Sequence, residues 1–332
     1  MIEYIIRRVL IMFPTLFVIS VIVFTVIQLP PGDFLTTYAI NLEQSGEPVA
    51  MEVLDALRER YGLDKPMVVQ YSKWIGGILL RGDFGQSFGH WRPVKDLIWE
   101  RLGLTASIAL ITIVITWMIA VPIGIYSATH QYKFSDYAFT FAGYIGLSIP
   151  AFMLALLVMN AAHMKFGLDV GGLFSDEFID APWSLARVVD LLQHIWVPVL
   201  VLSVGGTAGL IRVMRANLLD QLELPYVETA RASGLSETKL LLKYPVRVAI
   251  NPIVSTIGWM LPQLFSGSVI VAMVLSLQTT GPLLLRALMD QDMHLAGAMI
   301  MILSALTVIG TLISDILLAW VDPRIRFERQ TS

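Results

Sequence analysis

Six long stretches of the chain contain no Asp, Glu, Lys or Arg, and they constrain the fold more than any other feature. They are residues 9–30, 102–132, 137–164, 191–211, 248–285 and 293–314. About 20 apolar residues in a helix span the hydrocarbon core of a bilayer, and each stretch reaches that length. The 23 basic and 26 acidic residues all lie between these stretches. This pattern predicts an all-α, polytopic membrane protein with six transmembrane helices, and it excludes a soluble enzyme, a disordered chain and a protein with a single anchor.

The residue types that are absent narrow the functional classes. The chain has no cysteine, which removes thiolate catalysis, disulfides and cysteine-ligated metal sites. Its five histidines form no His-x-x-x-His pair, so no metal site is expected. The net charge of −3 favours neither nucleic-acid binding nor a polybasic membrane-surface module. No phosphate-binding Gly-x-x-x-x-Gly-Lys-Ser/Thr loop occurs in the sequence, so any use of ATP requires a partner.

The distribution of basic residues predicts the orientation in the membrane. With six spans and a cytoplasmic N-terminus, the inside segments carry twelve Lys and Arg against eight acids, and the outside segments eleven against seventeen. Basic residues near helix ends are retained on the cytoplasmic side, so both termini are expected in the cytoplasm. Residues 9–30 exceed the length of a signal-peptide core and lack a small-x-small cleavage site. They are therefore expected to remain as a membrane helix.

The fifth uncharged stretch is too long for one simple span. Its 38 residues would reach about 57 Å as a helix, against a hydrocarbon core of about 30 Å. Two spans here would place the C-terminus outside, against the distribution of basic residues. We therefore expect one helix over about 252–275, followed by an apolar outside segment that turns at residues 279–282.

The remaining segments suggest a division of the chain. Residues 31–100 form the largest outside segment, in which residues 51–60 have apolar side chains at helical spacing. We expect residues 1–100 to comprise the first membrane helix and this extracytoplasmic segment. Residues 101–332 are then a five-helix core with a cytoplasmic loop at about 212–250.

That cytoplasmic loop carries the clearest local signals in the chain. Pro225 suits the first turn of a helix, and Gly234 suits the left-handed residue just past a helix end. A helix of about 225–233 is expected. Ser236 then caps a second short helix, which Pro245 ends.

Several segments of the sequence resemble a known family. The loop reads Tyr226-Val227-Glu228-Thr229-Ala230-Arg231-Ala232-Ser233-Gly234. It resembles the EAA loop of ABC-importer permeases, in which Glu, a small residue, Ala, three residues and Gly precede a second helix. Further segments resemble the oligopeptide/dipeptide permease subfamily and cover nearly the whole chain in order. They are Arg7-Arg8, Pro30-Pro31-Gly32-Asp33, Gly62-Leu63-Asp64-Lys65-Pro66, Gly82-Asp83-Phe84-Gly85-Gln86-Ser87, and Asp315 with Asp322-Pro323-Arg324-Ile325-Arg326.

The resemblance implies a subunit of the bacterial inner (cytoplasmic) membrane with the type I ABC-importer permease fold. Such a subunit pairs with a homologous second permease, and an extracytoplasmic binding protein delivers the solute. Two cytoplasmic ATPases bind ATP and Mg and supply the energy, so the chain itself is not an enzyme and carries no cofactor. Each loop helix would sit in a cleft of an ATPase. The implied coupling residues are Glu228, Thr229, Ala230, Ala232, Gly234 and Leu235.

The sequence departs from the family pattern at two places. The second Ala of the EAA signature is Thr229. After the fifth span, many members have a Glu followed by a Leu-Pro-Gly-type turn, whereas this chain has Leu277-Gln278-Thr279-Thr280-Gly281-Pro282. The second departure leaves the solute open among peptides, oligosaccharides and other small polar molecules.

Uncharged polar residues within the spans are candidates for lining the path of a polar solute. They are Asn160, Gln263, Ser266 and Ser268. An alternative of another class is a channel or ion-coupled carrier that works alone, but such a carrier usually needs ionisable groups in mid-membrane. The six stretches hold none. Asp315 lies near the inner end of the last span, where Arg324, Arg326 or snorkelling would satisfy it.

Intramembrane proteolysis is a further alternative that the sequence leaves formally open. Ser148 with His163 or His194 would supply a serine–histidine pair. A serine beside Pro150 in a membrane helix more often packs against a neighbour or satisfies the backbone.

Overall fold

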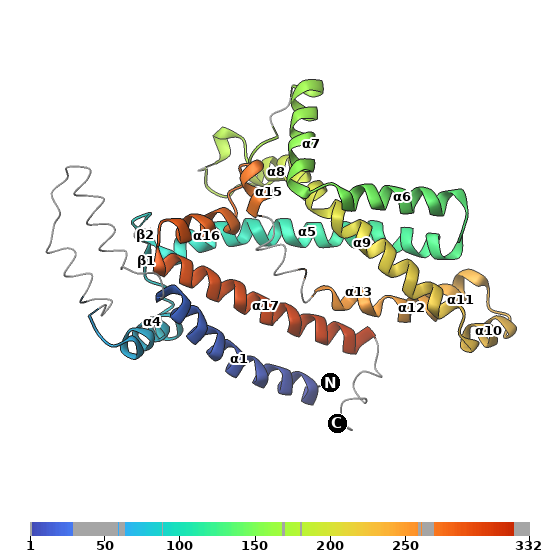
Figure 1. Cartoon of the computed structure of the whole chain (residues 1–332), viewed down its shortest axis with the longest axis horizontal. Coiled ribbons are helices and arrows are strands. Elements are labelled where there is room, and N and C mark those ends of the chain that lie inside the picture. Colours follow the sequence, from blue (N-terminus) through green and yellow to red (C-terminus); the bar gives the residue numbers. More distant parts are fainter. Residues whose placement is uncertain are drawn as a thin grey trace. The chain divides into compact units, whose positions relative to one another are not determined.

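In the part of the chain that the computed structural model describes, the regular structure is helical apart from one small hairpin (Figure 1). It describes residues 2–28, 59, 64–87, 89–167, 170–179, 181–257, 260 and 269–321. The residues form two compact units. The larger unit comprises Met1–Val9, Thr105–Gln278 and Thr307–Ser332, and the smaller unit comprises Leu10–Leu104 and Thr279–Leu306.

The described elements follow one another along the chain as seventeen short and long segments. They are α1 (Ile2–Gln28), α4 (Met67–Arg81), β1 (Gln86–Ser87), β2 (Arg92–Pro93), α5 (Val94–Thr129), α6 (Phe134–Ser148), α7 (Ala151–Phe166), the 3-10 helix η1 (Asp176–Phe178), α8 (Leu185–His194), α9 (Trp196–Leu222), α10 (Pro225–Ala232), α11 (Glu237–Lys243), α12 (Pro245–Ala249), α13 (Asn251–Ser255), α15 (Val269–Val274), α16 (Thr280–Met289) and α17 (Met293–Val321). The two strands pair antiparallel, with Gln86 opposite Pro93.

The all-α, polytopic class is confirmed. Among the described residues, four helices are long and apolar enough to cross a membrane, namely α1, α5, α9 and α17. The pair α6 and α7 passes the same test together, which gives up to five spans. The six-span count and the cytoplasmic position of both termini stay predictions.

The third uncharged stretch differs from one straight span. It folds into α6 and α7, which are bent by 99° relative to each other. The break lies at Ile149 and Pro150, where Ile149 is extended with a ψ of 118°. A proline disfavours helical backbone at the residue before it and lacks the N–H of a helix interior, so the helix stops and restarts in a new direction.

The fifth uncharged stretch is described only in part. Within the predicted helix over 252–275, α13 and α15 are helical, and residues 258, 259 and 261–268 lie outside the described residues. The predicted turn at 279–282 is wrong. The chain turns earlier, at Ser276 with a φ of +53°, and α16 begins at Thr280. Pro282 lies in the first turn of α16, where its missing N–H costs no helical hydrogen bond.

Close packing of α9 against its neighbours holds the larger unit together. Glycines allow this approach, because a Cβ added at Gly124 of α5 would lie 2.6 Å from the Met214 Cβ of α9. On α6, a Cβ at Gly146 would lie 3.0 Å from Val204 Cγ1. Buried residues of α5, α9 and α12 with Ile253 of α13 form one apolar cluster around Met214 and Leu218. The helices of the larger unit therefore meet at α9.

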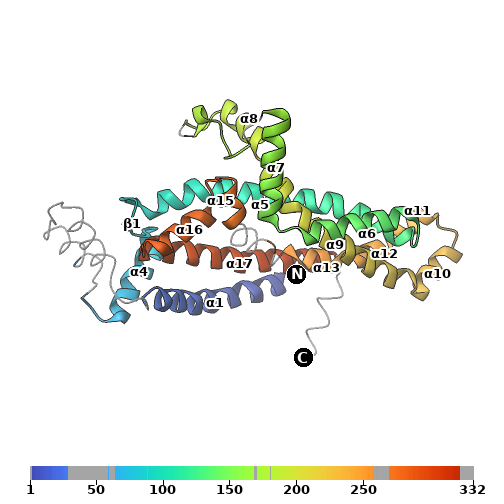
Figure 2. The same ribbon diagram turned by 45° about the horizontal axis from the view of Figure 1, so that its top comes forward.

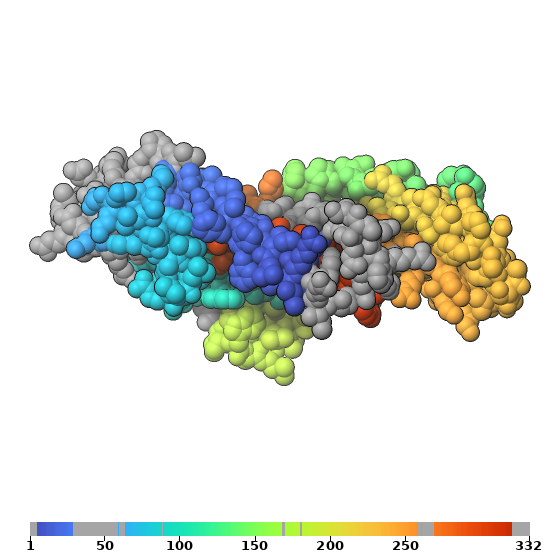
Figure 3. All heavy atoms as spheres, turned by 90° about the horizontal axis from the view of Figure 1, so that it is seen from below, coloured from blue at the N-terminus to red at the C-terminus, as the bar shows by residue number. Residues whose placement is uncertain are grey.

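In the smaller unit, α4 packs on α1 through aromatic rings. The Phe24 ring centroid lies 5.5 Å from that of Tyr71, and the Tyr71 hydroxyl lies 2.7 Å from Ser20 Oγ. Figure 3 shows these two helices, in dark and light blue, side by side. Buried Asp292 joins the hairpin to the start of α17, because its carboxylate accepts hydrogen bonds from Ser87 Oγ at 2.5 Å and Leu295 N at 3.1 Å. The predicted helix at 51–60 lies outside the described residues, apart from residue 59.

An ion pair joins the two ends of the chain in the larger unit. Arg8 Nη1 of α1 lies 2.8 Å from Asp315 Oδ2 of α17. Arg8 thus supplies the partner that we expected from Arg324 or Arg326, which lie outside the described residues. The start of α1 and the last third of α17 therefore lie together.

Candidate functional site

The two short helices of the loop after α9 follow the predicted pattern. Helix α10 begins at Pro225 and ends just before Gly234, which has a left-handed φ of +77°. Helix α11 follows with Ser236 at its N-cap position. One detail of the prediction is wrong, because the Ser236 side chain accepts no capping hydrogen bond. Helix α11 ends before Pro245 as predicted, and Pro245 also begins α12, in whose first turn its missing N–H is harmless.

Each helix of the pair buries one side chain, and α11 connects the pair to the membrane bundle. Val227 of α10 is fully inaccessible to solvent, and Leu240 of α11 is 1% exposed. Leu241 packs on the apolar cluster of α9 and α12. Figure 2 shows α10 and α11 at the end of α9, with α12 alongside. Burial of two aliphatic side chains stabilises the pair by about 3–6 kcal/mol in total. Helix α10 contacts α11 and α11 contacts α12, so the pair is connected to the bundle through α12.

The motif residues lie on the opposite, open side of this pair. Four of them are exposed and two are half-buried. The exposed ones are Glu228, Thr229, Ala232 and Gly234, and the half-buried ones are Ala230 and Leu235. A Cβ added at Gly234 would meet no atom within 4 Å, so its left-handed backbone, and not crowding within this chain, favours glycine there. The pair thus presents a small-residue surface with one carboxylate, which another protein could approach closely.

An ion pair closes the turn between α10 and α11. Arg231 Nε lies 2.7 Å from Glu237 Oε1, and the second guanidinium nitrogen lies 3.3 Å from Oε2. The hydrogen bonds from Arg231 lower the pKa of Glu237, and those to Glu237 raise the pKa of Arg231. Both side chains are largely exposed, so water and salt screen the attraction.

Replacing Glu237 with Gln is therefore expected to leave the melting temperature of the purified protein close to the wild-type value. Because the folded-state pKa of Glu237 is lowered, the contribution of the pair is present at neutral pH and is lost as the pH falls through that lowered pKa. Thermal unfolding followed by intrinsic fluorescence at neutral and acidic pH measures both effects. A large drop in melting temperature at neutral pH would show that the turn depends on this pair.

Two family models together match most of the chain. The model of the binding-protein-dependent transport system inner membrane component matches residues 120–327, and the model of the N-terminal part of such membrane components matches residues 1–109. The chain belongs to this family. It is thus a multi-pass permease of a binding-protein-dependent transport system, and neither matched model describes an ATPase.

Full-length relatives carry names from the same transport class. The permease is 35% identical to the oligopeptide transport system permease protein AppB of Bacillus subtilis over 98% of this chain and all of the relative. It is 32% identical to a putative peptide permease protein of Brucella ovis, over 98% of this chain and 99% of that protein. It is also 30% identical to the glutathione transport system permease protein GsiC of Escherichia coli K12, over 99% and 100% of the two chains.

Sequence reasoning missed a buried ion pair near the same end of α9. Arg215 of α9 donates to both carboxylate oxygens of Asp136 in α6, from Nε at 3.0 Å and from Nη2 at 2.9 Å. The Asp136 side chain is 4% exposed. Ser127 Oγ of α5 and the backbone N–H of Tyr132 also donate to this carboxylate. These four hydrogen bonds satisfy the buried charge of Asp136, which would otherwise be costly in the permease.

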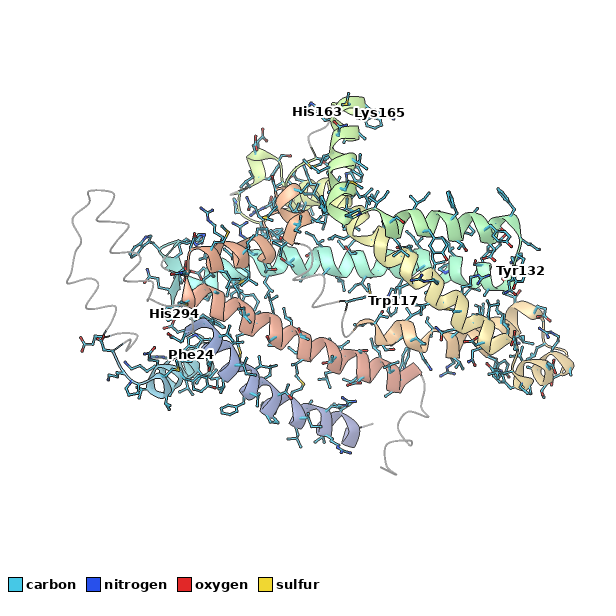
Figure 4. All side chains as sticks on the ribbon, viewed as in Figure 1. Phe24, Trp117, Tyr132, His163, Lys165 and His294 are labelled. Atoms are coloured by element: carbon cyan, nitrogen blue, oxygen red, sulfur yellow. The ribbon has the colours of Figure 1, made fainter. Side chains whose placement is uncertain are left out.

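This network ties three membrane helices together. Tyr132, labelled in Figure 4, lies in the tight turn between α5 and α6 and has a left-handed φ of +63°. Arg215 lies about two helical turns before the end of α9, which leads directly to α10. A displacement of α10 can therefore reach α5 and α6 through the Arg215–Asp136 pair. In the sequence, the only sign was that Asp136 directly precedes one uncharged stretch and Arg215 lies four residues after another. The pairing itself required the packing of α6 on α9.

Of the four candidate pathway residues, the structure describes one. Asn160 lies on an exposed face of α7, and Gln263, Ser266 and Ser268 lie outside the described residues. Their assignment to the pathway stays a prediction.

The serine–histidine alternative finds no support in the geometry. Ser148 Oγ donates to the backbone carbonyl of Tyr144 at 2.7 Å, which is the backbone-satisfying role. His163 lies at the far end of α7 beside Lys165, both labelled in Figure 4, and Ser148 precedes the start of that helix. His194 Nδ1 lies 2.8 Å from the Asp190 carbonyl oxygen.

Proposed function

We propose that this permease is the translocation subunit of an ATP-driven importer that moves peptides across the inner membrane by alternating access. The names of its full-length relatives, which include oligopeptide, peptide and glutathione permeases, support a peptide-like solute. On this proposal a homologous second permease completes the pathway. Two cytoplasmic ATPases bind ATP and Mg, and an extracytoplasmic binding protein delivers the solute.

The observation that carries the proposal is the anchored loop pair. Helices α10 and α11 bury Val227 and Leu240, and α11 packs on α12, while the motif surface around Glu228 stays open. A pair held in this way transmits force instead of bending away from it. Closure of the ATPase dimer would push on Glu228, Thr229, Ala230, Ala232, Gly234 and Leu235. The push would then move α9, and the Arg215–Asp136 pair would pass the movement to α5 and α6.

The proposed orientation places this loop and both termini in the cytoplasm. The excess of basic residues in the predicted inside segments supports it. The Arg8–Asp315 ion pair supports a common side for the two termini, because it joins the start of α1 to the last third of α17.

Reconstitution into liposomes tests the proposed function. The purified permease alone is expected to move no labelled di- or oligopeptide, with or without ATP. The complete assembly, containing the second permease, the ATPases and the binding protein, is expected to take up peptide only when ATP is present on the ATPase side. A matched assembly with ATPases unable to hydrolyse ATP serves as the control. ATP-independent uptake by the permease alone would instead identify a self-sufficient carrier or channel.

A further inference from the structure

Helix α8 has its polarity reversed relative to a helix on the surface of a soluble domain. One face consists only of aliphatic side chains and is exposed. Its members are Leu185 at 83%, Val188 at 39%, Val189 at 47% and Leu192 at 58% exposure. They recur at i, i+3, i+4 and i+7, so they share one side of the helix. The opposite side, which faces the rest of the larger unit, carries Arg187, Asp190 and His194.

The charged groups on the inward side all have partners in the protein. Asp190 accepts hydrogen bonds from Ser175 Oγ at 2.6 Å and from Ser175 N at 2.9 Å. Burial alone would raise the pKa of Asp190, but these bonds and nearby His194 hold the pKa below its ordinary value. The carboxylate is therefore charged and faces inward.

Arg187 is held just as firmly on this inward side. It donates to the backbone carbonyls of Ala181 and Ile179. Its guanidinium carbon also lies 4.6 Å from the Phe174 ring centroid and 4.7 Å from that of Trp183. With these charged groups turned inward, the four outward aliphatic side chains offer no hydrogen-bonding group to water or to a polar protein surface, and the exposed polar Gln193 lies beside them.

The aliphatic face continues into a membrane span. Helix α9 starts two residues after α8 ends, and its Trp196 and Leu200 are exposed in the same way. Exposed Trp183 lies just before α8, so tryptophans flank the helix on both sides. Tryptophan is enriched at the level of the lipid headgroups. The surroundings of the face are thus those of a membrane–water boundary.

The length of α9 sets the depth of α8. The uncharged part of α9, residues 196–211, extends about 24 Å, which comes within one helical turn of a hydrocarbon core of about 30 Å. Helix α8 precedes this part, so at most its last turn can enter the core. It therefore lies near the boundary. Figures 1 and 2 show α8 close to α7 and to the start of α9.

We infer that α8 is an interfacial helix whose aliphatic face, formed by Leu185, Val188, Val189 and Leu192, is inserted into the boundary between lipid headgroups and acyl chains. This face contacts lipid, and the helix thereby fixes the depth of α9 in the bilayer. The inference does not depend on the transported solute. The proposed orientation is needed only to say which boundary this is, and it places α8 at the extracytoplasmic leaflet.

Site-directed spin labelling tests the inference, because the natural chain has no cysteine. Leu185→Cys and Leu192→Cys are labelled in the complete assembly in phosphatidylcholine–phosphatidylglycerol nanodiscs. Collision rates with oxygen, which concentrates in lipid, are compared with those of a water-soluble nickel chelate. Leu200→Cys on α9 is the lipid-exposed control and Glu177→Cys on η1 is the water-exposed control. All four positions are exposed, so the labels are expected to leave the fold intact.

The expected result is an oxygen-to-nickel collision ratio at residues 185 and 192 that is several-fold above that of residue 177 and approaches that of residue 200. A ratio equal to that of residue 177 would place the face in water and overturn the inference. Low collision rates with both reagents would show that a protein partner covers the face, which would also overturn it. Retained peptide uptake by each labelled assembly separates either failure from a failure of the proposed function.

Discussion

Assemblies carrying Glu228→Arg are expected to lose peptide uptake and solute-stimulated ATP hydrolysis while the permease remains in the membrane in normal amounts. The Glu228 carboxylate is exposed in the first turn of α10, so within the permease the change costs only about 0.3–1 kcal/mol of helix-dipole energy. In a contact with an ATPase, reversing a charge costs about 2–5 kcal/mol. That corresponds to a loss of coupled activity of at least about 25-fold.

The matched control for this variant is Glu223→Arg. Glu223 is an exposed acid at the end of α9, five residues from Glu228 and outside the motif. The Glu223→Arg variant makes the same change of charge, and uptake is expected to stay close to the wild-type rate.

A bulky residue at Gly234 is expected to abolish uptake as well, because it strains the left-handed backbone and fills the open surface that the ATPase would approach. Unchanged transport in both Glu228→Arg and a Gly234→Leu variant would refute the coupling role of this surface.

The second large effect is expected at the buried pair of Asp136 and Arg215. Removing one partner of a buried ion pair destabilises a protein by about 3–5 kcal/mol, because the other charge is left uncompensated. Asp136→Ala is expected near the lower end of this range, since the Arg215 side chain retains 27% exposure. The amount of permease in the membrane and its melting temperature should both fall. Fluorescence-detected size-exclusion chromatography of detergent extracts at rising temperature measures the shift.

A milder variant separates stability from transmission. Asp136→Asn keeps the shape of the side chain and removes the charge, so more protein should survive than with Ala. If the pair passes movement from α9 to α6, the assembly with Asn at this position should transport less peptide per ATP hydrolysed. Arg212→Ala, on the same helix but exposed, is the control and should leave this ratio unchanged. A normal ratio in Asp136→Asn would restrict the pair to a purely structural role.

Local chemistry accounts for what the sequence predicted well. The helix of α10 could be placed to within a residue because Pro225 and Gly234 act through their own backbone conformations. The break of the third uncharged stretch at Pro150 has an equally local cause, but a search for uncharged length alone overlooks it. The turn after α15 was placed too late, because Gly281-Pro282 is as compatible with a helix start as with a turn.

The candidate site shows the limit of the same reasoning. The sequence marked Glu228 and its neighbours as a motif, but their exposure depends on which side of α10 buries Val227. The sequence of α8 likewise has one aliphatic and one polar side, and by itself it does not indicate which of them meets the protein. In a soluble domain the aliphatic side would be buried. In this structure the polar side is buried, because Ser175, Phe174 and the carbonyls of the preceding loop satisfy its charges.

The sequence by itself determined that this protein crosses a membrane several times through helices and that a helix pair with a glycine turn lies between two of its spans. These properties follow from hydropathy over about 20 residues and from backbone preferences within one or two turns. Only the tertiary structure decided that Arg215 meets Asp136, that Arg8 meets Asp315, and that the charged side of α8 faces inward. These contacts join residues far apart in the chain, so they depend on how whole helices pack and not on the local preferences that a sequence pattern records.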